Sequence, residues 1–339
     1  MQSVEGPRRS RALGRPGPRT LVAAAVLAPW LIWAIVRSFG LEAGPAIPAM
    51  TFTPYVGLIS PLPLLLALVL RRWVVAALAL LVVGAFVHAL LPRALAGPQS
   101  TVRDGVTVRV MAANLFVGQG DPRAVVDLVR RHRVDILALE ELPPEALARL
   151  DRAGLRRIMP YRRYEVAGGG ATSSGLFSRR PITTLQAENS LHRQGEPRGL
   201  IRIAAPPALP IDLQVIHPVP PIDPEWRGIW RHMLGELTRP SGGDRLRVLA
   251  GDFNATLDHH ALRRLLGDGG YVDAADAVGA GYDTTWPAGR DFPPEITIDH
   301  VLVDPRVRVQ DVSVHTVPRS DHRAVIATLV LPRAAPGGG

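Results

Sequence analysis

The first third of the chain contains three apolar stretches that follow one another with only short breaks. They cover residues 21–36, roughly 55–70 and 73–91, and each is close to the ~17–25 residues that a helix needs to cross a bilayer. A single stretch of this kind could be a buried core helix, but three in succession favour membrane spans. The second contains Pro61 and Pro63, which a packed membrane helix tolerates. We therefore expect three transmembrane helices within residues 21–91.

Residues 21–36 also have the basic flank of a secretory signal peptide. The following Ile35-Val36-Arg37 sequence is not a small-residue cleavage site, and further apolar stretches come after it. We therefore expect an uncleaved first span. Residues 1–20 are rich in Pro, Gly and Arg and lack apolar periodicity, which predicts a disordered tail.

The positions of the arginines predict the orientation of these spans. Five arginines precede the first span, and Arg71 and Arg72 lie between the second and third, whereas residues 38–54 contain none. Because basic segments stay in the cytoplasm, the N-terminal tail and the Arg71-Arg72 loop are predicted to be cytoplasmic. Three spans then place everything after residue 91 on the outer face of the cell membrane.

The net charge of +9 is unevenly distributed along the chain. All 39 basic residues are arginine, and residues 1–100 carry a net +7 while residues 101–339 carry only +2. A nearly neutral second part argues against a nucleic-acid partner, which needs many basic contacts. The absence of cysteine excludes a disulfide framework, thiolate metal sites and a cysteine nucleophile.

After a linker over residues 92–104, short apolar runs alternate with amphipathic segments. Strands are predicted at 106–111, 135–139, 211–216, 246–250, 300–303 and 324–331, and helices at 122–133, 224–237 and 259–266. This interleaving is typical of an α/β or α+β fold with a large sheet core. We expect one domain over residues 105–332 and a short disordered tail over 333–339.

Polar side chains gather where these predicted strands end. They are Asn114, Glu140, Glu141, His217, Asp252, Asn254, Asp299, Asp321 and His322. Any one alone could be a turn residue, but so many at strand ends, where α/β sheets form their sites, point to a functional centre.

The residue types limit the chemistry of this centre. Separated carboxylates and amides suit Mg²⁺ or Mn²⁺ rather than Zn²⁺, and histidines beside aspartates suit acid–base work or binding of an anionic transition state. Gly-x-Ser-x-Gly, Gly-x-Gly-x-x-Gly and His-Glu-x-x-His motifs are missing from the sequence, which weakens acyl transfer, dinucleotide chemistry and zinc proteolysis. A hard metal with a His–Asp pair indicates phosphate ester hydrolysis.

Seven short blocks resemble, in the same order, those of the endonuclease/exonuclease/phosphatase superfamily with its pancreatic-DNase-like fold. They lie at residues 113–115, 135–142, 175–181, 215–218, 251–256, 298–300 and 320–322. The resemblance covers about residues 105–331 and implies a four-layered sandwich of two mixed β-sheets flanked by helices. It also implies a phosphoric ester hydrolase that depends on a divalent metal.

The resemblance implies a role for each of these residues. Glu141 would be the main metal carboxylate, with Asn114 and Asp321 in the same metal site. The superfamily usually has Gln where this chain has Glu140, so the choice between the two glutamates stays open, with the alignment favouring Glu141. The catalytic residues would be His322 on the scissile phosphate, Asp299 orienting it, Asp252 activating water, Asn254 contacting phosphoryl oxygens, and His217 as a second phosphate-facing histidine.

Three functions compete at this stage. The first is an outer-face phosphatase or phosphodiesterase acting on a membrane-bound substrate. The second is a surface-anchored nuclease cutting extracellular DNA or RNA, which the nearly neutral domain disfavours. The third is a catalytically degenerate membrane partner, which the presence of every block disfavours. Three spans before such a domain resemble actinobacterial proteins associated with teicoplanin-type glycopeptide resistance, which implies a cell-envelope lipid phosphate such as undecaprenyl pyrophosphate as substrate.

Aromatic residues supply the remaining candidates. Trp226 and Trp230 lie four apart on a predicted helix and are expected to pack in the core. Trp286 precedes Asp299 on a loop and is a candidate for the substrate entrance. Residues 168–170 are three consecutive glycines, which we interpret as a hairpin tip.

Overall fold

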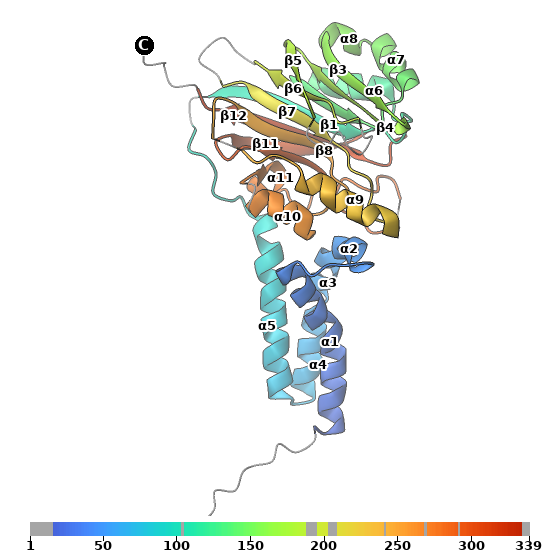
Figure 1. Cartoon of the computed structure of the whole chain (residues 1–339). Coiled ribbons are helices and arrows are strands. Elements are labelled where there is room, and N and C mark those ends of the chain that lie inside the picture. Colours follow the sequence, from blue (N-terminus) through green and yellow to red (C-terminus); the bar gives the residue numbers. More distant parts are fainter. Residues whose placement is uncertain are drawn as a thin grey trace, which may run out of the picture.

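The computed structural model describes residues 16–102, 105–187, 195–202, 209–240, 242–267, 270–290 and 292–333. It consists of a helical stem and, from residue 106 onward, a domain built on β-sheets (Figure 1). The predicted tails lie largely outside the described residues. Residues 18–20, which we expected in the N-terminal tail, already belong to the first helix.

Two stem helices are long and apolar enough to cross a membrane. They are α1 (Pro18–Phe39) and α5 (Trp73–Leu90), the latter extended by the turn η2 (Leu91–Ala94). The prediction of a third unbroken span is wrong, because the segment between them is divided into α2 (Ala46–Ala49), η1 (Met50–Phe52), α3 (Thr53–Leu58) and α4 (Pro61–Val69). The two halves of this segment are bent by 48° and make a third span only if counted together.

Proline explains the break in the second segment. Pro61 has no backbone N–H to continue the preceding helix, so α4 starts afresh at that residue. The nine residues of α4 rise about 14 Å, roughly half of the ~30 Å hydrocarbon core of a bilayer. α4 alone is therefore too short to cross a bilayer, and only α3 and α4 together approach the thickness of the hydrocarbon core.

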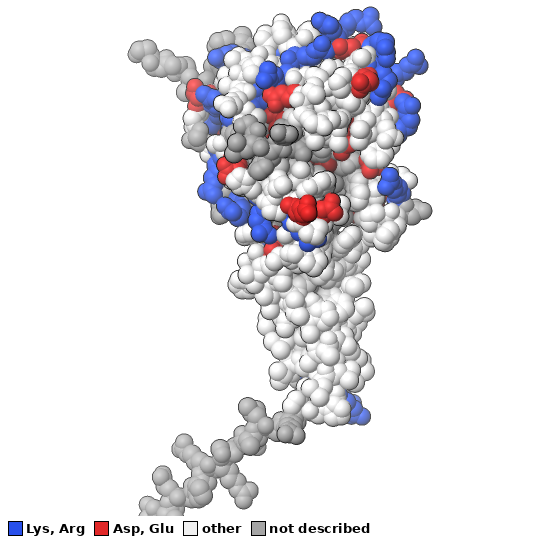
Figure 2. Space-filling model, turned by 45° about the vertical axis from the view of Figure 1, so that its right-hand side comes forward, with Lys and Arg blue, Asp and Glu red and all other residues white. Residues whose placement is uncertain are grey.

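The three longer elements of the stem pack along one another through small side chains. Ala23 of α1, Ala67 of α4 and Ala79 of α5 are buried in one cluster, which permits the close backbone approach typical of membrane helices. The indole nitrogens of Trp30 and Trp33 donate to Val56 O (3.1 Å) and Thr53 Oγ1 (3.0 Å), and so hold α3 against α1. On the face shown in Figure 2, the stem displays no charged side chains over most of its length and basic ones at the end far from the domain.

The domain contains two six-stranded sheets. The first has the order β11-β12-β1-β2-β4-β3 and the second the order β5-β6-β7-β8-β10-β9. The strands of the first are β1 (Val106–Asn114), β2 (Ile136–Glu140), β3 (Tyr161–Ala167), β4 (Gly169–Ser178), β11 (Arg308–Thr316) and β12 (Arg323–Leu331). Those of the second are β5 (Ile182–Leu185), β6 (Arg198–Ile201), β7 (Ile211–Ile216), β8 (Leu246–Asp252), β9 (Val272–Asp273) and β10 (Asp299–Val303). Both sheets are mixed, because β1–β2 and β7–β8 pair in parallel and the remaining pairs are antiparallel.

Alternation along the strands sorts side chains into layers. Val110 of β1 and Val248 of β8 meet in the core between the sheets, whereas Met111 of β1 faces outward against helices. The outer face of the first sheet is covered by α6 (Pro122–Arg131), α7 (Pro144–Ala153) and α8 (Leu155–Ile158). The outer face of the second sheet is covered by α9 (Pro224–Gly235) and α10 (His260–Gly267). The short helix α11 (Ala274–Ala277) packs against the core between the sheets. The predicted four-layered sandwich is confirmed. The stem joins it on the side of α9 and α10 (Figure 1).

Buried ion pairs join stem and domain. The Asp258 carboxylate, whose side chain is 0% exposed, accepts from Arg37 Nε at 2.6 Å and from both terminal nitrogens of Arg93 at 2.7 and 2.8 Å. The backbone N–H of His260 donates to the Glu42 carboxylate. The expected linker is also anchored, because Ala96 forms a β-bridge with Val278. The sheet domain is therefore held in one position relative to the stem.

Candidate active site

The sheet topology brings the polar residues predicted from sequence to one edge of the sandwich. Asn114 ends β1, and β12 runs antiparallel to β1, so the residues just before β12 lie beside it. In the second sheet, Asp252 ends β8 and pairs directly with Asp299 at the start of β10. Strands far apart in sequence therefore deliver amide, carboxylate and imidazole groups to a shared centre.

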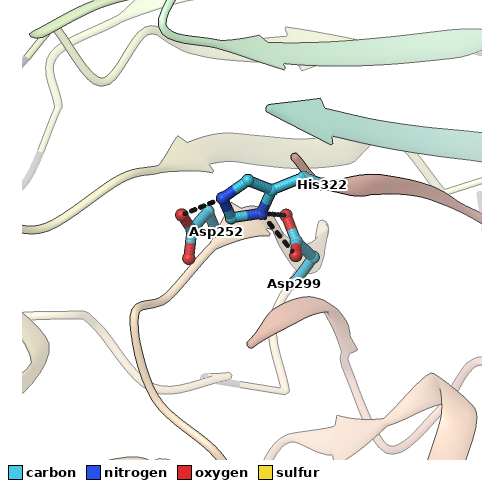
Figure 3. A group of neighbouring side chains, drawn as sticks. All are labelled: Asp252, Asp299 and His322. Carbon is cyan, nitrogen blue, oxygen red and sulfur yellow. Dashed lines mark hydrogen bonds and ion pairs between the residues drawn. The ribbon is translucent and has the colours of Figure 1, made fainter. Parts of the chain in front are cut away.

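His322 lies between two carboxylates at this centre (Figure 3). Its Nδ1 is 2.9 Å from Asp299 Oδ2, and its Nε2 is 3.7 Å from Asp252 Oδ2. Burial opposes protonation of the ring, but the nearby Asp299 and Asp252 carboxylates prevail and raise the pKa of His322 to about 10. The imidazole is thus held in its charged form, with Nε2 directed toward Asp252.

The Asp252 carboxylate is surrounded by nitrogen groups that can donate hydrogen bonds. Its Oδ2 is 3.2 Å from Asn114 Nδ2 and 3.9 Å from His217 Nε2, while its Oδ1 accepts the Asn254 backbone N–H at 2.8 Å. Burial raises the pKa of this carboxyl to about 6, with His322 opposing the shift and Asp299 reinforcing it. A carboxylate with a pKa close to neutrality is suited to accept a proton from water.

The two adjacent glutamates occupy different environments. Glu141 lines the cleft, and its carboxylate accepts from Asn114 Nδ2 (3.0 Å) and from the Val117 backbone N–H (2.7 Å). Glu140 is fully buried, and its carboxylate makes no hydrogen bond within the described residues. Burial, followed by the charges of Asp299 and Asp252, raises the pKa of Glu140 well above its usual range. Glu141 is therefore the one placed to meet a ligand.

Left-handed backbone conformations cluster around this centre. Glu141 and Asn254 have φ values of +50° and +48°, and Phe116 and Val117, which follow β1, have +48° and +50°. Non-glycine residues adopt this region at a cost of about 1–3 kcal/mol, and such outliers concentrate at functional sites. Here the turn at Glu141 lets consecutive residues diverge, so that Glu140 goes under the sheet edge and Glu141 into the cleft.

Supporting hydrogen bonds come from residues to which the sequence assigned no role. Thr285 Oγ1 accepts from the Asp299 backbone N–H (3.1 Å), Ser320 Oγ donates to Asn114 O (2.8 Å), and Glu196 Oε1 accepts from the His217 backbone N–H (2.8 Å). Each fixes the backbone beside a predicted site residue. Thr285 and Ser320 lie next to predicted residues in sequence, but Glu196 has no local signal that indicates this contact.

The oxygen-rich side chains fit a divalent cation. Asp321 Oδ1 is buried without a hydrogen bond from any described residue, and Glu141, which lines the same cleft, adds carboxylate oxygens of the kind that Mg²⁺ and Mn²⁺ prefer. Asn114 turns its Nδ2 toward Glu141 and Asp252, and its Oδ1 accepts the Phe116 backbone N–H at 2.9 Å. Asp252, Asp299 and His322 also bring one ligand atom each within 4.8 Å of one another. The assignment of the metal to Glu141, Asn114 and Asp321 therefore stays a prediction.

A cleft of about 600 Å³ opens over these residues. Glu141, His217, Asp252, Asn254, Asp321 and His322 line it, together with Trp226, Trp286 and the stem residues Pro48, Thr51 and Phe52. Trp286 Nε1 is 3.3 Å from Asp321 Oδ2, and its role at the substrate entrance stays a prediction. The expectation that both helical tryptophans are core residues is wrong for Trp226, which is 41% exposed, and correct for Trp230.

The chain is similar to one protein family and to several solved structures. The sequence profile described as the Endonuclease/Exonuclease/phosphatase family matches residues 111–322. Among solved structures, an endonuclease/exonuclease/phosphatase from Beutenbergia cavernae is 18% identical, covering 66% of this chain and 72% of that one (TM-score 0.49). Truncated TDP2 from Caenorhabditis elegans is 17% identical, covering 66% of this chain and 98% of that one (TM-score 0.48). Sphingomyelinase C from Streptomyces griseocarneus is 15% identical, covering 66% of this chain and 99% of that one (TM-score 0.46). No curated protein sequence matches.

Proposed function

Because the chain belongs to the Endonuclease/Exonuclease/phosphatase family, we propose that it is a membrane-anchored phosphoesterase that acts on a phosphorylated lipid of the cell envelope. The single observation that carries this proposal is the composition of the cleft. His322, Asp252 and Glu141 form one side, and Pro48, Thr51 and Phe52 of the membrane stem form another. A substrate that occupies this cleft meets acid–base groups and the membrane region at once.

The side chains divide the work of hydrolysis among them. Asp252 accepts a proton from the attacking water as the new P–O bond forms and the bond to the leaving oxygen breaks. The charged His322, fixed by Asp299, stabilises negative charge on the phosphoryl oxygens, with Asn254 and His217 at the same cleft. Glu141, Asn114 and Asp321 would hold Mg²⁺ or Mn²⁺, which supplies neutralisation of the phosphate charge. Fixed positions of these groups lower the reorganisation needed during reaction.

Detergent-purified protein with Mg²⁺ is expected to release phosphate from undecaprenyl pyrophosphate or to cleave phospholipids, and to leave plasmid DNA intact. Chelation with EDTA should abolish the activity and added Mg²⁺ or Mn²⁺ should restore it, because the carboxylates repel an anionic substrate when no cation is bound. Phosphate release and gel electrophoresis provide the readouts. Rapid DNA cleavage without lipid turnover would favour a surface-anchored nuclease instead. Complete inactivity on all three substrates would favour a degenerate membrane partner.

We also propose that the domain lies on the outer face of the plasma membrane. Arg19 at the start of α1 and the Arg71-Arg72 turn between α4 and α5 belong to the end of the stem that is far from the domain (Figure 1). Basic segments remain cytoplasmic, so this arrangement supports an extracytoplasmic domain. Tethering there would confine enzyme and lipid substrate to the same layer and raise their effective concentration.

Proteolysis of intact cells tests this orientation. An added protease is expected to degrade the sheet domain in intact cells and to leave a protected fragment containing the stem, detectable with an N-terminal tag. Permeabilised cells, in which both sides are accessible, serve as the control. A domain that survives in intact cells but is degraded after permeabilisation contradicts the proposed orientation.

A further inference from the structure

A second cavity, of about 650 Å³, lies where the stem meets the domain. Its stem side is apolar and includes Leu58 of α3 with Val83, Phe86 and Val87 of α5. Its domain side comes from the segment around residues 281–284 and 295–297. Helices of the membrane region and a loop of the catalytic domain therefore enclose the cavity together.

Two hydrogen bonds hold the walls of this cavity in place. Tyr55 Oη donates to Glu295 O at 2.6 Å, and Tyr282 Oη donates to Leu90 O at 2.7 Å. Each links a stem element to the domain loop on the other side. Because Asp258 also binds Arg37 and Arg93 next to the cavity, the space is part of a fixed junction.

The second cavity adjoins the catalytic cleft. Thr51 and Ile296 line both, so one thin partition of stem and domain residues borders the two spaces. The cleft carries the charged groups Glu141, Asp252 and His322 within an otherwise largely apolar lining. The second cavity is also lined mostly by apolar side chains, and its charged lining residues are Arg93, Asp258 and Glu295. A cleft with these charged groups beside a second, mostly apolar cavity matches a molecule with a phosphate head and a hydrocarbon chain.

Two stem residues that line the second cavity are also exposed on the outer surface of the molecule. Val87, on the membrane-spanning α5, is 49% exposed, and Leu58 is exposed on α3. A hydrocarbon chain entering between these residues would move from lipid into a protein cavity of similar polarity and lose little of its favourable apolar environment. A nucleic acid or a free phosphate compound would have nothing to place there.

We propose that this cavity binds the hydrocarbon chain of the lipid whose phosphate occupies the catalytic cleft. The inference rests on the proposed function and adds a site for the chain, formed by α3, α5 and the loop that contains Ile296. It follows that the stem selects the substrate as well as anchoring the enzyme, because a molecule lacking a long chain leaves this compartment unfilled.

Two isoprenoid pyrophosphates with the same head group and different chain lengths test the proposal. Undecaprenyl pyrophosphate has a long chain and isopentenyl pyrophosphate almost none. In full-length protein with Mg²⁺, Val87→Trp is expected to lower kcat/KM for the long-chain substrate at least tenfold and to leave that for the short one unchanged. Leu58→Trp, on α3 of the same stem side, should act in the same way. Val74→Trp is the matched control, since Val74 lies on the same helix, is 77% exposed and lines neither cavity.

Binding is measured separately from turnover. A phosphatidic acid with a photoreactive group at the end of its acyl chain, supplied in vesicles, should label peptides of α5 or of residues 281–297, less so in Val87→Trp than in Val74→Trp. Long-chain turnover that both cavity variants leave unchanged, with labelling elsewhere, overturns the chain site and leaves the proposed function standing. Specific labelling without hydrolysis of any lipid overturns the proposed function and retains the chain site. Val87→Trp could instead lower kcat/KM equally for both substrates and also lower the unfolding temperature, which would indicate a damaged fold. In that case Leu58→Trp decides, and the absence of a selective effect in Leu58→Trp counts against the chain site.

Discussion

Replacement of His322 by alanine is expected to lower kcat/KM for phosphate ester hydrolysis by roughly 10³-fold, and Asp252→Ala by roughly 10²–10⁴-fold, the range of general acid–base and charge-stabilising groups. His322 supplies a positive charge fixed by Asp299, and Asp252 is the carboxylate whose pKa of about 6 suits proton acceptance. Initial rates of purified protein on bis(4-nitrophenyl) phosphate with Mg²⁺ provide the measurement, since this substrate needs no membrane.

Matched controls separate loss of chemistry from loss of structure. His232→Ala and Asp127→Ala remove the same side chains from exposed helix positions, and both should retain nearly normal rates. Circular dichroism should show that all four variants fold. If either His322→Ala or Asp252→Ala turns over substrate at a near-normal rate, the assignment of that residue is incorrect.

Asp258→Ala is expected to destabilise the protein by about 3–5 kcal/mol, the usual consequence of removing one partner from a buried ion pair. The variant leaves Arg37 and Arg93 buried at the junction without their shared carboxylate. Thermal unfolding in detergent micelles provides the measurement. Asp151→Ala is the control, because Asp151 pairs with Arg162 at 2.7 Å in a partly exposed position, where such a pair contributes about 0–1 kcal/mol.

Acidification should reduce the difference between wild type and Asp258→Ala. Burial disfavours ionisation of Asp258, but Arg93 and Arg37 outweigh it and lower the pKa of the folded state below its usual value. The stabilisation is then complete above the unfolded pKa of about 3.9 and is lost as the pH falls through the lower folded pKa. Unfolding temperatures that are equal for wild type and variant at neutral pH would show that the buried pair does not stabilise the junction.

Six interior strands, β1, β2, β7, β8, β10 and β12, could be predicted from sequence, whereas the interior strands β4 and β6 were not predicted. In β7, apolar residues alternate with Asp212 and Gln214, and the strand predicted at 246–250 extends to Asp252 in β8. The edge strands gave no such signal. In β3 (Tyr161–Ala167) and β5 (Ile182–Leu185) no side chain is fully buried, so their sequences lack the apolar pattern that reveals a strand.

The candidate site could be predicted in its residues but not in its surroundings. Strand ends and short motifs identified Asn114, Asp252 and His322, because the chemistry of a site depends on residue type. The stem wall of the cleft could not be found in this way. Pro48, Thr51 and Phe52 lie in short helices between two membrane segments, and their position in the cleft depends on how the stem docks onto the domain.

The pairing of β1 with β12 determines when the active site can exist during synthesis. These are the first and last strands of the domain, and Val106 pairs with Leu331. His322 reaches Asp252 only after this closure, so the residues of the candidate site come together only once the chain has been made at least through β12. Such long-range closure slows folding. A chain arrested or clipped before β12 would lack the strand that closes the first sheet and the His322–Asp299 contact.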